Sequence, residues 1–453
     1  MVLSRAGCTR VWRRNIERRG SMLTPGPLNA SPAGSRWLVF MTVLAVYICM
    51  IDRIAISIAI IPMAEQNGWS PTVQGAVMSA FFLGYVTLQI PAGYLSDRFG
   101  GKWVLGLGVL FWSCFTLLTP ASALLGISVL LACRFLMGVA EAVTWPSIYS
   151  LYSRWVHPDR RASAVGLMNS GISGGSVIAL ICTPWLISVW SWQGAFYLYG
   201  ILGLIWFAVW APVARSRPAA APDWARADAL AARSLLDDRA ADIAPEPAYP
   251  RLTLRRMLRS KAVWAIATAH ICINWSLYLV LSWFPTFINR ELGADLQLAG
   301  FLALAPIAMS LVMAPIAGRL FDGLIGKGFD RLKIRRVMQS LAFFGITGAM
   351  LAITLTDSLI LSVTVITLSN ALTALSIGGF ATNHLDIAPN QSGLLMGVTN
   401  TLAAVSSSLS VFASGWIQDT TGGWDAVFQT AAAVSILGAV IYARMAGVER
   451  EFD

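Results

Sequence analysis

Long apolar runs separated by short polar stretches make up most of this chain. An α-helix that crosses a bilayer needs about 20 predominantly apolar residues, and a run of about 18 or more is a candidate span. The candidate runs cover residues 36–61, 72–93, 103–120, 124–150, 162–188, 195–213, 261–284, 297–318, 337–356, 359–382, 393–416 and 425–445. This pattern predicts an all-α integral membrane protein with twelve transmembrane helices.

The composition supports this class of protein. Hydrophobic residues make up 56% of the chain and charged residues only 12%, against about 25% charged in an average soluble domain. The six cysteines form no CxxC pair and five lie in the predicted spans, so we interpret them as small buried side chains. We therefore expect no metal site and no cofactor.

The positive charges are arranged as in a membrane protein. The net charge is +10. Of the 33 Lys and Arg residues, 30 lie in segments on one side of the predicted spans, and the other three are Arg53, Arg134 and Arg290. Because cytoplasmic segments carry an excess of Lys and Arg, this distribution places both termini in the cytoplasm. The basic balance thus reflects topology, and we expect no nucleic-acid partner.

The spans fall into two groups of six, separated by a polar segment. PAGYLSD at 91–97 recurs as PIAGRLFD at 315–322, and GLMNS at 166–170 recurs as GVTNT at 397–401. Such repeats predict two pseudo-symmetric six-helix bundles with a site near the bilayer midplane. The expected parts are a disordered basic cytoplasmic tail at 1–35, bundles at 36–213 and 261–446, a cytoplasmic linker at 214–260 and a tail at 447–453.

The amino-terminal segment leaves its role open. It is rich in arginine and contains one acidic residue, Glu17, with no apolar stretch before residue 36, so it does not resemble a secretory signal. It is a cytoplasmic tail, or an organellar transit peptide, or an untranslated stretch ahead of Met22. We expect a multi-pass protein of a bacterial inner (cell) membrane.

Four ionisable residues lie deep in the predicted spans. A charge near the bilayer centre costs about 2.5–3.5 kcal/mol on insertion scales, so such residues indicate a functional site. Arg134 and Glu141 are seven residues apart and share one face of a helix. Asp52 and Arg53 are adjacent and point about 100° apart, so we expect one to face a central cavity and the other a neighbouring helix. The alternative is a structural ion pair.

A short loop between spans 2 and 3 carries a motif with regular spacing. Its residues are Gly93, Asp97, Arg98, Gly101 and Lys102. We expect the glycines to let two helices pack closely, and the charged residues to latch the cytoplasmic side in one of two bundle packings. In the second half Gly323 replaces the arginine, so that latch is weaker.

Polar residues also lie in the carboxyl-terminal half. His270, Asn274 and Tyr278 form a stripe on one face of span 7, where His270 is either a core histidine or a cavity residue that takes part in proton coupling. Pro285 is expected to break that helix. A buried Asn400 in span 11 has hydrogen-bonding groups that a substrate could satisfy.

The connection between spans 10 and 11 is expected to be short. Asp386, Pro389 and Asn390 are residue types that favour turns, so the sequence predicts a tight cytoplasmic turn there.

Three stretches give the chain a clear resemblance. They are IDR at 51–53, the loop motif at 93–102, and NHLDIAP at 383–389 with GLLMGVTNT after it. The chain resembles the anion:cation symporter branch of the major facilitator superfamily, which includes sialin, vesicular glutamate transporters, plastid phosphate transporters and bacterial D-galactonate and hexuronate permeases. The resemblance implies a twelve-helix transporter that works by alternating access.

The resemblance also implies roles for single residues. Arg53 would pair with the substrate anion, Asp52 and Glu141 would be protonation sites, and Arg134 would bind the anion or hold Glu141. Tyr85 and Asn400 resemble substrate-binding residues of the sugar-acid permeases. Met50 and Ile172 depart from the polar residues expected at their positions, which favours a less hydroxylated or aromatic carboxylate over a sugar acid.

The sequence therefore predicts a transporter and no enzyme. We expect proton-coupled symport of a small organic anion, such as a sugar acid, a dicarboxylate or an aromatic acid, by a monomer embedded in the lipid bilayer. The alternatives are an inorganic phosphate transporter, with sodium as a possible coupling ion, and an uncoupled anion facilitator or exchanger. No motif of a membrane enzyme is found in the sequence.

Overall fold

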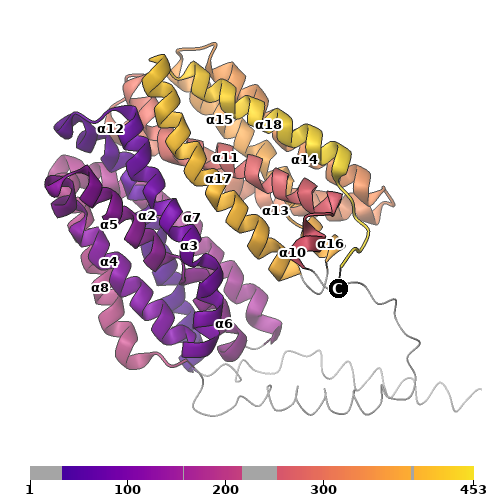
Figure 1. Cartoon of the computed structure of the whole chain (residues 1–453), viewed down its shortest axis with the longest axis horizontal. Coiled ribbons are helices and arrows are strands. Elements are labelled where there is room, and N and C mark those ends of the chain that lie inside the picture. The colour runs from indigo at the N-terminus through magenta and orange to yellow at the C-terminus, as the bar shows by residue number, and fades with distance from the viewer. Residues whose placement is uncertain (1–32, 157, 217–252, 389–391, 453) are drawn as a thin grey trace, which may run out of the picture.

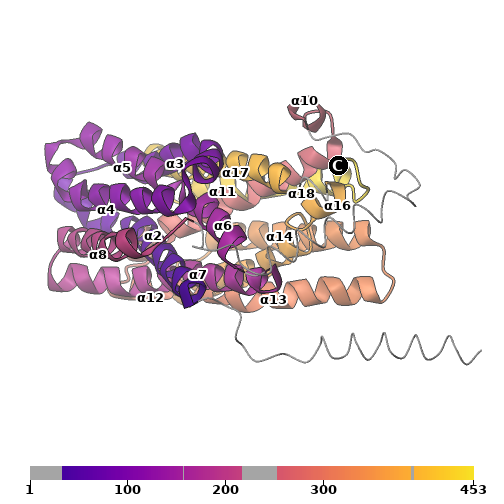
Figure 2. The same ribbon diagram turned by 90° about the horizontal axis from the view of Figure 1, so that it is seen from below.

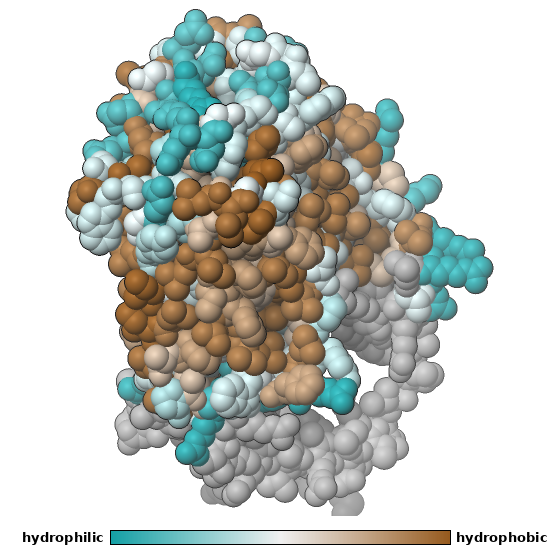
Figure 3. All heavy atoms as spheres, turned by 60° about the vertical axis from the view of Figure 1, so that its left-hand side comes forward, coloured by the Kyte–Doolittle hydropathy of each residue, from teal (hydrophilic) through white to brown (hydrophobic). Residues whose placement is uncertain are grey.

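A computed structural model describes residues 33–156, 158–216, 253–388 and 392–452. Every regular element in these ranges is helical. Twelve helices are long and apolar enough to cross a membrane, from Ser35–Asn67 to Asp425–Met445. Figure 3 shows the apolar belt that these helices present, with hydrophilic residues gathered at the two ends of the molecule. The expected all-α, twelve-span fold is confirmed.

The amino-terminal half contains seven helices that form six spans. They are α2 (Ala33–Asn67), α3 (Pro71–Phe99), α4 (Gly101–Leu125), α5 (Ile127–Glu141), α6 (Thr144–Trp155), α7 (Pro158–Val189) and α8 (Trp192–Val213). The fourth span is divided between α5 and α6, and the break follows Glu141 directly. The Thr144 hydroxyl donates to the Glu141 carbonyl across this break at 2.7 Å.

The carboxyl-terminal half contains both long helices and short helical segments. They are α10 (Leu254–Met257), α11 (Lys261–Arg290), α12 (Leu296–Leu302), α13 (Leu304–Gly326), α14 (Arg331–Ile353), α15 (Leu359–Thr373), the 3₁₀ turn η1 (Ala374–Ile377), α16 (Asn383–Ile387), α17 (Ser392–Thr421) and α18 (Asp425–Met445). Side-chain caps begin several of them: the Ser260 hydroxyl accepts from Val263 N at 3.1 Å, and Asp330 accepts from Lys333 N at 2.7 Å.

One local expectation is wrong and others fall outside the described residues. Helix α11 continues through Pro285 to Arg290, because a transmembrane helix can tolerate a proline when neighbouring helices satisfy the freed carbonyl. Of the expected tail at 1–35, only its last three residues are described, and they begin α2. Most of the linker at 214–260 and the turn at 389–391 lie outside the described ranges.

The carboxyl-terminal segment folds back onto the molecule. The backbone amides of Glu451 and Phe452 donate to the Ile387 carbonyl at 2.9 and 3.0 Å. The Phe452 side chain is buried, and the Ser260 hydroxyl donates to the Glu451 carboxylate at 2.5 Å. These contacts tie the end of the chain to α16 and to the start of α11.

The two halves lie side by side, with α3 and α17 adjacent at their interface (Figures 1 and 2). The hydrogen bonds that join the halves at the ends opposite the termini include Thr72 to Asp419 at 2.5 Å and Gln297 to Ser188 at 3.2 Å. Gly75 lets the helices approach closely, because a Cβ there would lie 3.0 Å from the Val411 carbonyl oxygen. The two halves are therefore closed against each other at the end of the molecule where α2 leads into α3.

Candidate functional site

The four deep ionisable residues meet inside the amino-terminal half. Arg53 on α2 forms an ion pair with Glu141 at the end of α5, through its Nε at 2.9 Å and its Nη2. Cys49, one turn before Arg53, donates its thiol to the same Glu141 oxygen at 3.2 Å. The Glu141 side chain is completely buried and that of Arg53 is 9% exposed. The pair is therefore charge-balanced in a region nearly sealed from water.

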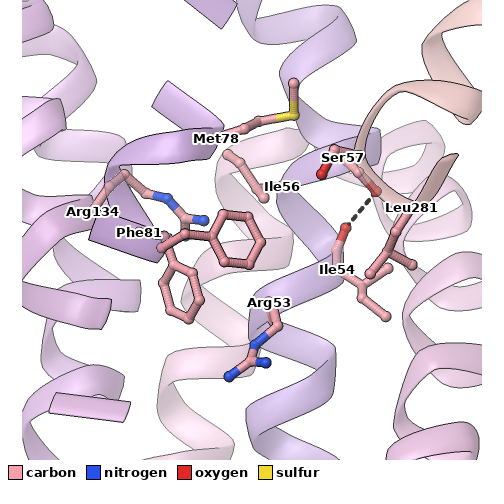
Figure 4. A pocket seen from close by; sticks show the side chains of 10 residues that line it. Arg53, Ile54, Ile56, Ser57, Met78, Phe81, Arg134 and Leu281 are labelled. Atoms are coloured by element: carbon pink, nitrogen blue, oxygen red, sulfur yellow. Dashed lines mark hydrogen bonds between the residues drawn. The ribbon is translucent and has the colours of Figure 1, made fainter. Parts of the chain in front are cut away.

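An aromatic ring separates the two arginines. The Phe81 ring centroid lies 5.2 Å from the Arg53 guanidinium carbon and 5.4 Å from that of Arg134, within the range of cation–π attraction. Tyr85, one turn further along α3, places its ring 4.9 Å from Arg53. Figure 4 shows Phe81 between the two arginines. Sequence reasoning found Tyr85 but missed Phe81, because an apolar residue in a span carries no functional signal.

A small cavity lies next to the two arginines (Figure 4). Its volume of about 10 Å³ is roughly that of one water molecule. The residues that line it are Arg53, Ile54, Ile56, Ser57, Met78, Phe81, Phe82, Arg134, Leu281 and Ser282. Both halves thus contribute to it, and in this closed arrangement there is room for a water but not for an organic anion.

Asp52 and Arg53 diverge as expected. Arg53 lines the cavity, whereas Asp52 turns toward α4, where Thr116, Trp112 and the nearby Arg134 are its neighbours. Asp52 is fully buried and neither of its carboxylate oxygens has a hydrogen-bond partner in the described part of the chain. Leaving a charged carboxylate in that state is costly.

Close helix packing brings these side chains together. Any Cβ at Gly84 on α3 would collide with the Phe135 backbone, and one at Gly138 on α5 would collide with the Phe81 backbone. Only glycine permits this approach. Among the described residues, Arg134 makes one hydrogen bond, to the Met137 sulfur at 3.2 Å, and Glu141 is bound by Arg53. Of the two roles expected for Arg134, holding Glu141 finds no hydrogen bond.

The candidate residues of the carboxyl-terminal half are dispersed. Tyr278 packs edge-on against Phe82 with centroids 4.7 Å apart, which places it beside the arginine site. The Asn274 amide donates to the His270 carbonyl at 3.0 Å within its own helix. Asn400 is half-buried on α17. None of the three lines the small cavity.

His270 lies deeper in the second half, in a network that sequence reasoning missed. Its Nδ1 is 3.2 Å from the Thr399 hydroxyl, which is also 2.9 Å from Nε2 of His384. His384 belongs to the NHLDIAP stretch, so a signal was present. The sequence could not show that the break between spans 10 and 11 folds His384 back toward span 7.

A second missed cluster holds that break in place. Arg335 on α14 is buried and donates to the Asp386 carboxylate at 2.5 Å, to the Gly378 and Gly379 carbonyls at 3.1 Å each and to the Thr382 hydroxyl at 2.8 Å. The sequence predicted a tight turn at Asp386. The structure shows instead a short helix, α16, whose Asp386 is bound by a buried arginine.

The loop motif between spans 2 and 3 is only partly as expected. Gly101 packs closely, because a Cβ there would lie 2.7 Å from the Ser147 carbonyl oxygen, but a Cβ at Gly93 would meet nothing within 4 Å. The close packing expected at Gly93 is therefore not found in this arrangement. Arg98 donates to the Tyr94 hydroxyl at 2.8 Å, and the Lys102 ammonium lies 4.6 Å from the Trp103 ring centroid. The Asp97 side chain is outside the described residues.

These features define the class of the protein. It is a multi-pass membrane protein whose two six-span halves meet around a buried pair of arginines. The chain belongs to the major facilitator superfamily, whose family model matches residues 41–411.

Curated relatives cover most of the chain. It is 36% identical over 408 residues to "Probable anion transporter 4, chloroplastic" from Oryza sativa subsp. japonica, with 90% of this chain and 68% of that protein covered. It is 34% identical to "Sodium-dependent phosphate transport protein 1, chloroplastic" and 33% identical to "Ascorbate transporter, chloroplastic", both from Arabidopsis thaliana, with 92% and 96% of this chain and 80% of each relative covered.

Solved structures share the fold at low identity. A bacterial homologue of the human lysosomal transporter Spinster, in an inward-facing and occupied conformation, superposes with a TM-score of 0.77 at 15% identity, covering 92% of this chain and 98% of the other. A D-xylose-proton symporter gives a TM-score of 0.66 at 14% identity, covering 90% and 97%. These neighbours support the fold and carry no argument on the substrate.

Proposed function

We propose that this protein is a secondary active transporter that moves a small organic anion together with a proton. The Arg53–Glu141 ion pair is the observation that carries the proposal. A buried arginine bound to an acid is free to bind a substrate carboxylate only when that acid is neutralised or displaced. Proton binding and anion binding at Arg53 are therefore linked by competition for one guanidinium.

The two acids support different steps of this cycle. Glu141 competes directly with the substrate, since it occupies the guanidinium in the present arrangement. Asp52 is buried without a hydrogen-bond partner among the described residues, which suits an acid that carries a proton through the membrane. Arg134, across Phe81 from Arg53, is positioned as a second anion ligand next to the pair.

A second function has its own support. One relative is named a sodium-dependent phosphate transport protein and another an ascorbate transporter. Two arginines in a closed site suit phosphate as well as a carboxylate. Phosphate transport with sodium coupling is therefore the alternative, and an uncoupled facilitator or exchanger would need neither acid for net movement.

The test uses the purified full-length chain in lipid vesicles. Uptake of radiolabelled uronate, aldonate, dicarboxylate, aromatic carboxylate and phosphate is measured first with an inward proton gradient and then with a sodium gradient. We expect one carboxylate to accumulate with the proton gradient. The Asp52→Asn, Glu141→Gln double variant should lose proton-driven accumulation while it still exchanges labelled for unlabelled anion.

Two results would count against the proposal. Sodium-driven phosphate uptake without carboxylate uptake would establish the alternative instead. Proton-driven uptake that survives in the double variant would remove Asp52 and Glu141 from the coupling mechanism. As a matched control, Asp295→Asn changes an exposed acid that caps α12 and should leave the coupling unchanged.

We also propose which kind of membrane contains this protein. The sequence led us to expect a bacterial inner membrane, but the relatives described above are chloroplastic, which does not fit. The arginine-rich, acid-poor composition of residues 1–21 agrees with an organellar location. We therefore favour an organellar membrane over a bacterial one.

A further inference from the structure

The buried network around Thr399 contains two of the three histidines of the chain. It joins α11 to α16 and α17, which lie more than 90 residues further along the chain. The Thr399 hydroxyl lies 3.2 Å from Nδ1 of His270, 2.9 Å from Nε2 of His384 and 3.2 Å from the Met396 carbonyl oxygen. All three side chains in the network are at least nine-tenths buried.

The hydrogen-bond partners fix the direction of each bond. Nδ1 of His384 lies 3.2 Å from the Ala381 carbonyl oxygen, which can only accept, so this nitrogen carries a proton. In neutral His384 the Nε2 atom is then an acceptor, and the Thr399 hydroxyl donates to it. That leaves the Thr399 oxygen to accept from Nδ1–H of His270. The result is one chain of bonds running from His270 through Thr399 to His384.

The network can also hold one extra proton without moving a heavy atom. If His384 is protonated, its Nε2–H donates to the Thr399 oxygen. The Thr399 hydroxyl then turns to the Met396 carbonyl, which already lies 3.2 Å away. His270 still donates to the Thr399 oxygen, which has two lone pairs. Every bond lost in this rearrangement is replaced.

We propose that His270, Thr399 and His384 form a proton-transfer path between the interface of the two halves and the cytoplasmic end of the protein. This inference rests on the proposed proton-coupled function and adds a route for the proton to the acids named there. His270 receives the proton at Nε2, which has no hydrogen-bond partner among the residues described. His384 belongs to α16, which lies between spans 10 and 11, and it releases the proton on the cytoplasmic side.

The transfer balances in a single step. Protonated His270 gives its Nδ1 proton to the Thr399 oxygen, while the Thr399 hydroxyl proton passes to Nε2 of His384. His270 is left neutral with its proton on Nε2, Thr399 is left as a neutral hydroxyl that points to Nδ1 of His270, and His384 carries the positive charge. No bond other than these O–H and N–H bonds forms or breaks.

In the described part of the chain, the groups around His384 offer no free negative charge that would hold the proton on its imidazole. α11 contributes His270, whose ring centroid is 6.4 Å away, so two positive charges would repel each other. α17 contributes the neutral Thr399. The charged and titratable groups that lie on α16, or contact it from α14, α18 and the carboxyl-terminal segment, are Asp386, Arg331, Arg335, Tyr442 and Glu451.

Those nearby groups are already occupied. Asp386 is bound by both arginines, Tyr442 accepts from the Asn383 amide at 3.3 Å and the Glu451 carboxylate accepts from Ser260. Burial lowers the pKa of His384 below its ordinary value. In this arrangement, closed toward the outside, the imidazole therefore favours giving its proton up, which is the direction that import requires.

The test reads the histidines directly, without substrate and without a gradient. The full-length protein is labelled with ¹⁵N-histidine in lipid nanodiscs, and His157, His270 and His384 are assigned with single glutamine variants. We expect both buried histidines to carry their proton on Nδ1 at pH 8. Thr399→Val removes the hydroxyl and should change the tautomer or the titration of both, whereas Thr399→Ser should restore the wild-type signals.

Thr401→Val is the matched control, because Thr401 lies on the same helix and bonds only to the Gly397 carbonyl among described residues. In vesicles, Thr399→Val should slow proton-driven uptake about tenfold and Thr401→Val should not. If Thr399→Val is poorly folded, His384→Gln takes its place and should alter the titration of His270. Histidine signals in Thr399→Val that match the wild type at every pH would overturn the path.

The two experiments fail separately. If NMR shows that Thr399 couples the two histidines but the protein has no proton-driven uptake, the proposed function is refuted and the hydrogen-bond network still stands. Proton-driven uptake with independent histidines would refute only the path.

Discussion

At the scale of single residues, the site depends on how each buried charge is compensated. Glu141 and Arg53 neutralise each other, whereas Asp52 has no hydrogen-bond partner in the described chain. Two acids of similar burial therefore differ in whether a partner side chain compensates their charge. A buried ion pair is costly to break because it leaves one charge unpaired, while an unpartnered acid is most easily accommodated when neutral.

This difference predicts opposite effects of two nearly isosteric substitutions. Glu141→Gln should destabilise the protein by about 3 kcal/mol, because it leaves the buried Arg53 guanidinium without its countercharge. Asp52→Asn should leave the stability unchanged or raise it, because no ion pair is lost. Melting temperatures in detergent at pH 7, followed by tryptophan fluorescence, would show the contrast. Equal losses in the two variants would mean that Asp52 is charged and paired.

At the scale of elements, the break between spans 10 and 11 is held in place by one buried side chain, that of Arg335. Arg335 satisfies two carbonyls at the end of η1 and binds Asp386 on α16. Its guanidinium also lies 4.6 Å from the Phe321 ring centroid. Helix ends leave carbonyls without partners, so a buried break in a membrane helix needs a donor of this kind.

The arginine should therefore control the local order of this break. Arg335→Ala should destabilise the protein by about 3–5 kcal/mol and increase hydrogen–deuterium exchange in residues 374–388. Arg331 binds the same Asp386 but its side chain is 52% exposed, so Arg331→Ala should cost less than about 1 kcal/mol. A comparable increase in exchange for both variants would show that Asp386, rather than the buried arginine, orders the segment.

At the scale of the whole molecule, the end where α2 leads into α3 is closed by backbone approach as well as by hydrogen bonds. A Cβ at Gly415 on α17 would lie 2.9 Å from the Trp283 ring and would collide with the Pro71 carbonyl at the start of α3. The two halves can reach this arrangement only with a glycine at that position. Arg290 adds a hydrogen bond to the Ile61 carbonyl at 3.3 Å.

A larger residue at this contact should hold this end of the molecule open. In Gly415→Leu, spin labels at the exposed Asn67 and Glu291 should move apart, and transport should slow because the closed state is disfavoured. Gly397→Leu is the matched control on the same helix, since a Cβ there meets nothing within 4 Å. An unchanged distance distribution in Gly415→Leu would show that the helices have another way to close.

The sequence by itself determined the membrane class, the number of spans and the four deep charges. Apolar run length and the cost of a charge in lipid depend on local composition, so they can be read along the chain. It also determined that Asp52 and Arg53 diverge, because adjacent helical residues always do. The continuity of α11 through Pro285 was not predictable in this way, since neighbouring helices decide whether a proline breaks a span.

Only the tertiary structure decided which charges pair and which polar groups meet. Arg53, Glu141 and Phe81 come from three helices, and their order depends on the approach that Gly84 and Gly138 allow. The contact of His270 with Thr399 and His384 depends on a break between spans that Arg335 holds from a fourth helix. Such contacts join residues far apart in the sequence, so no local pattern specifies them.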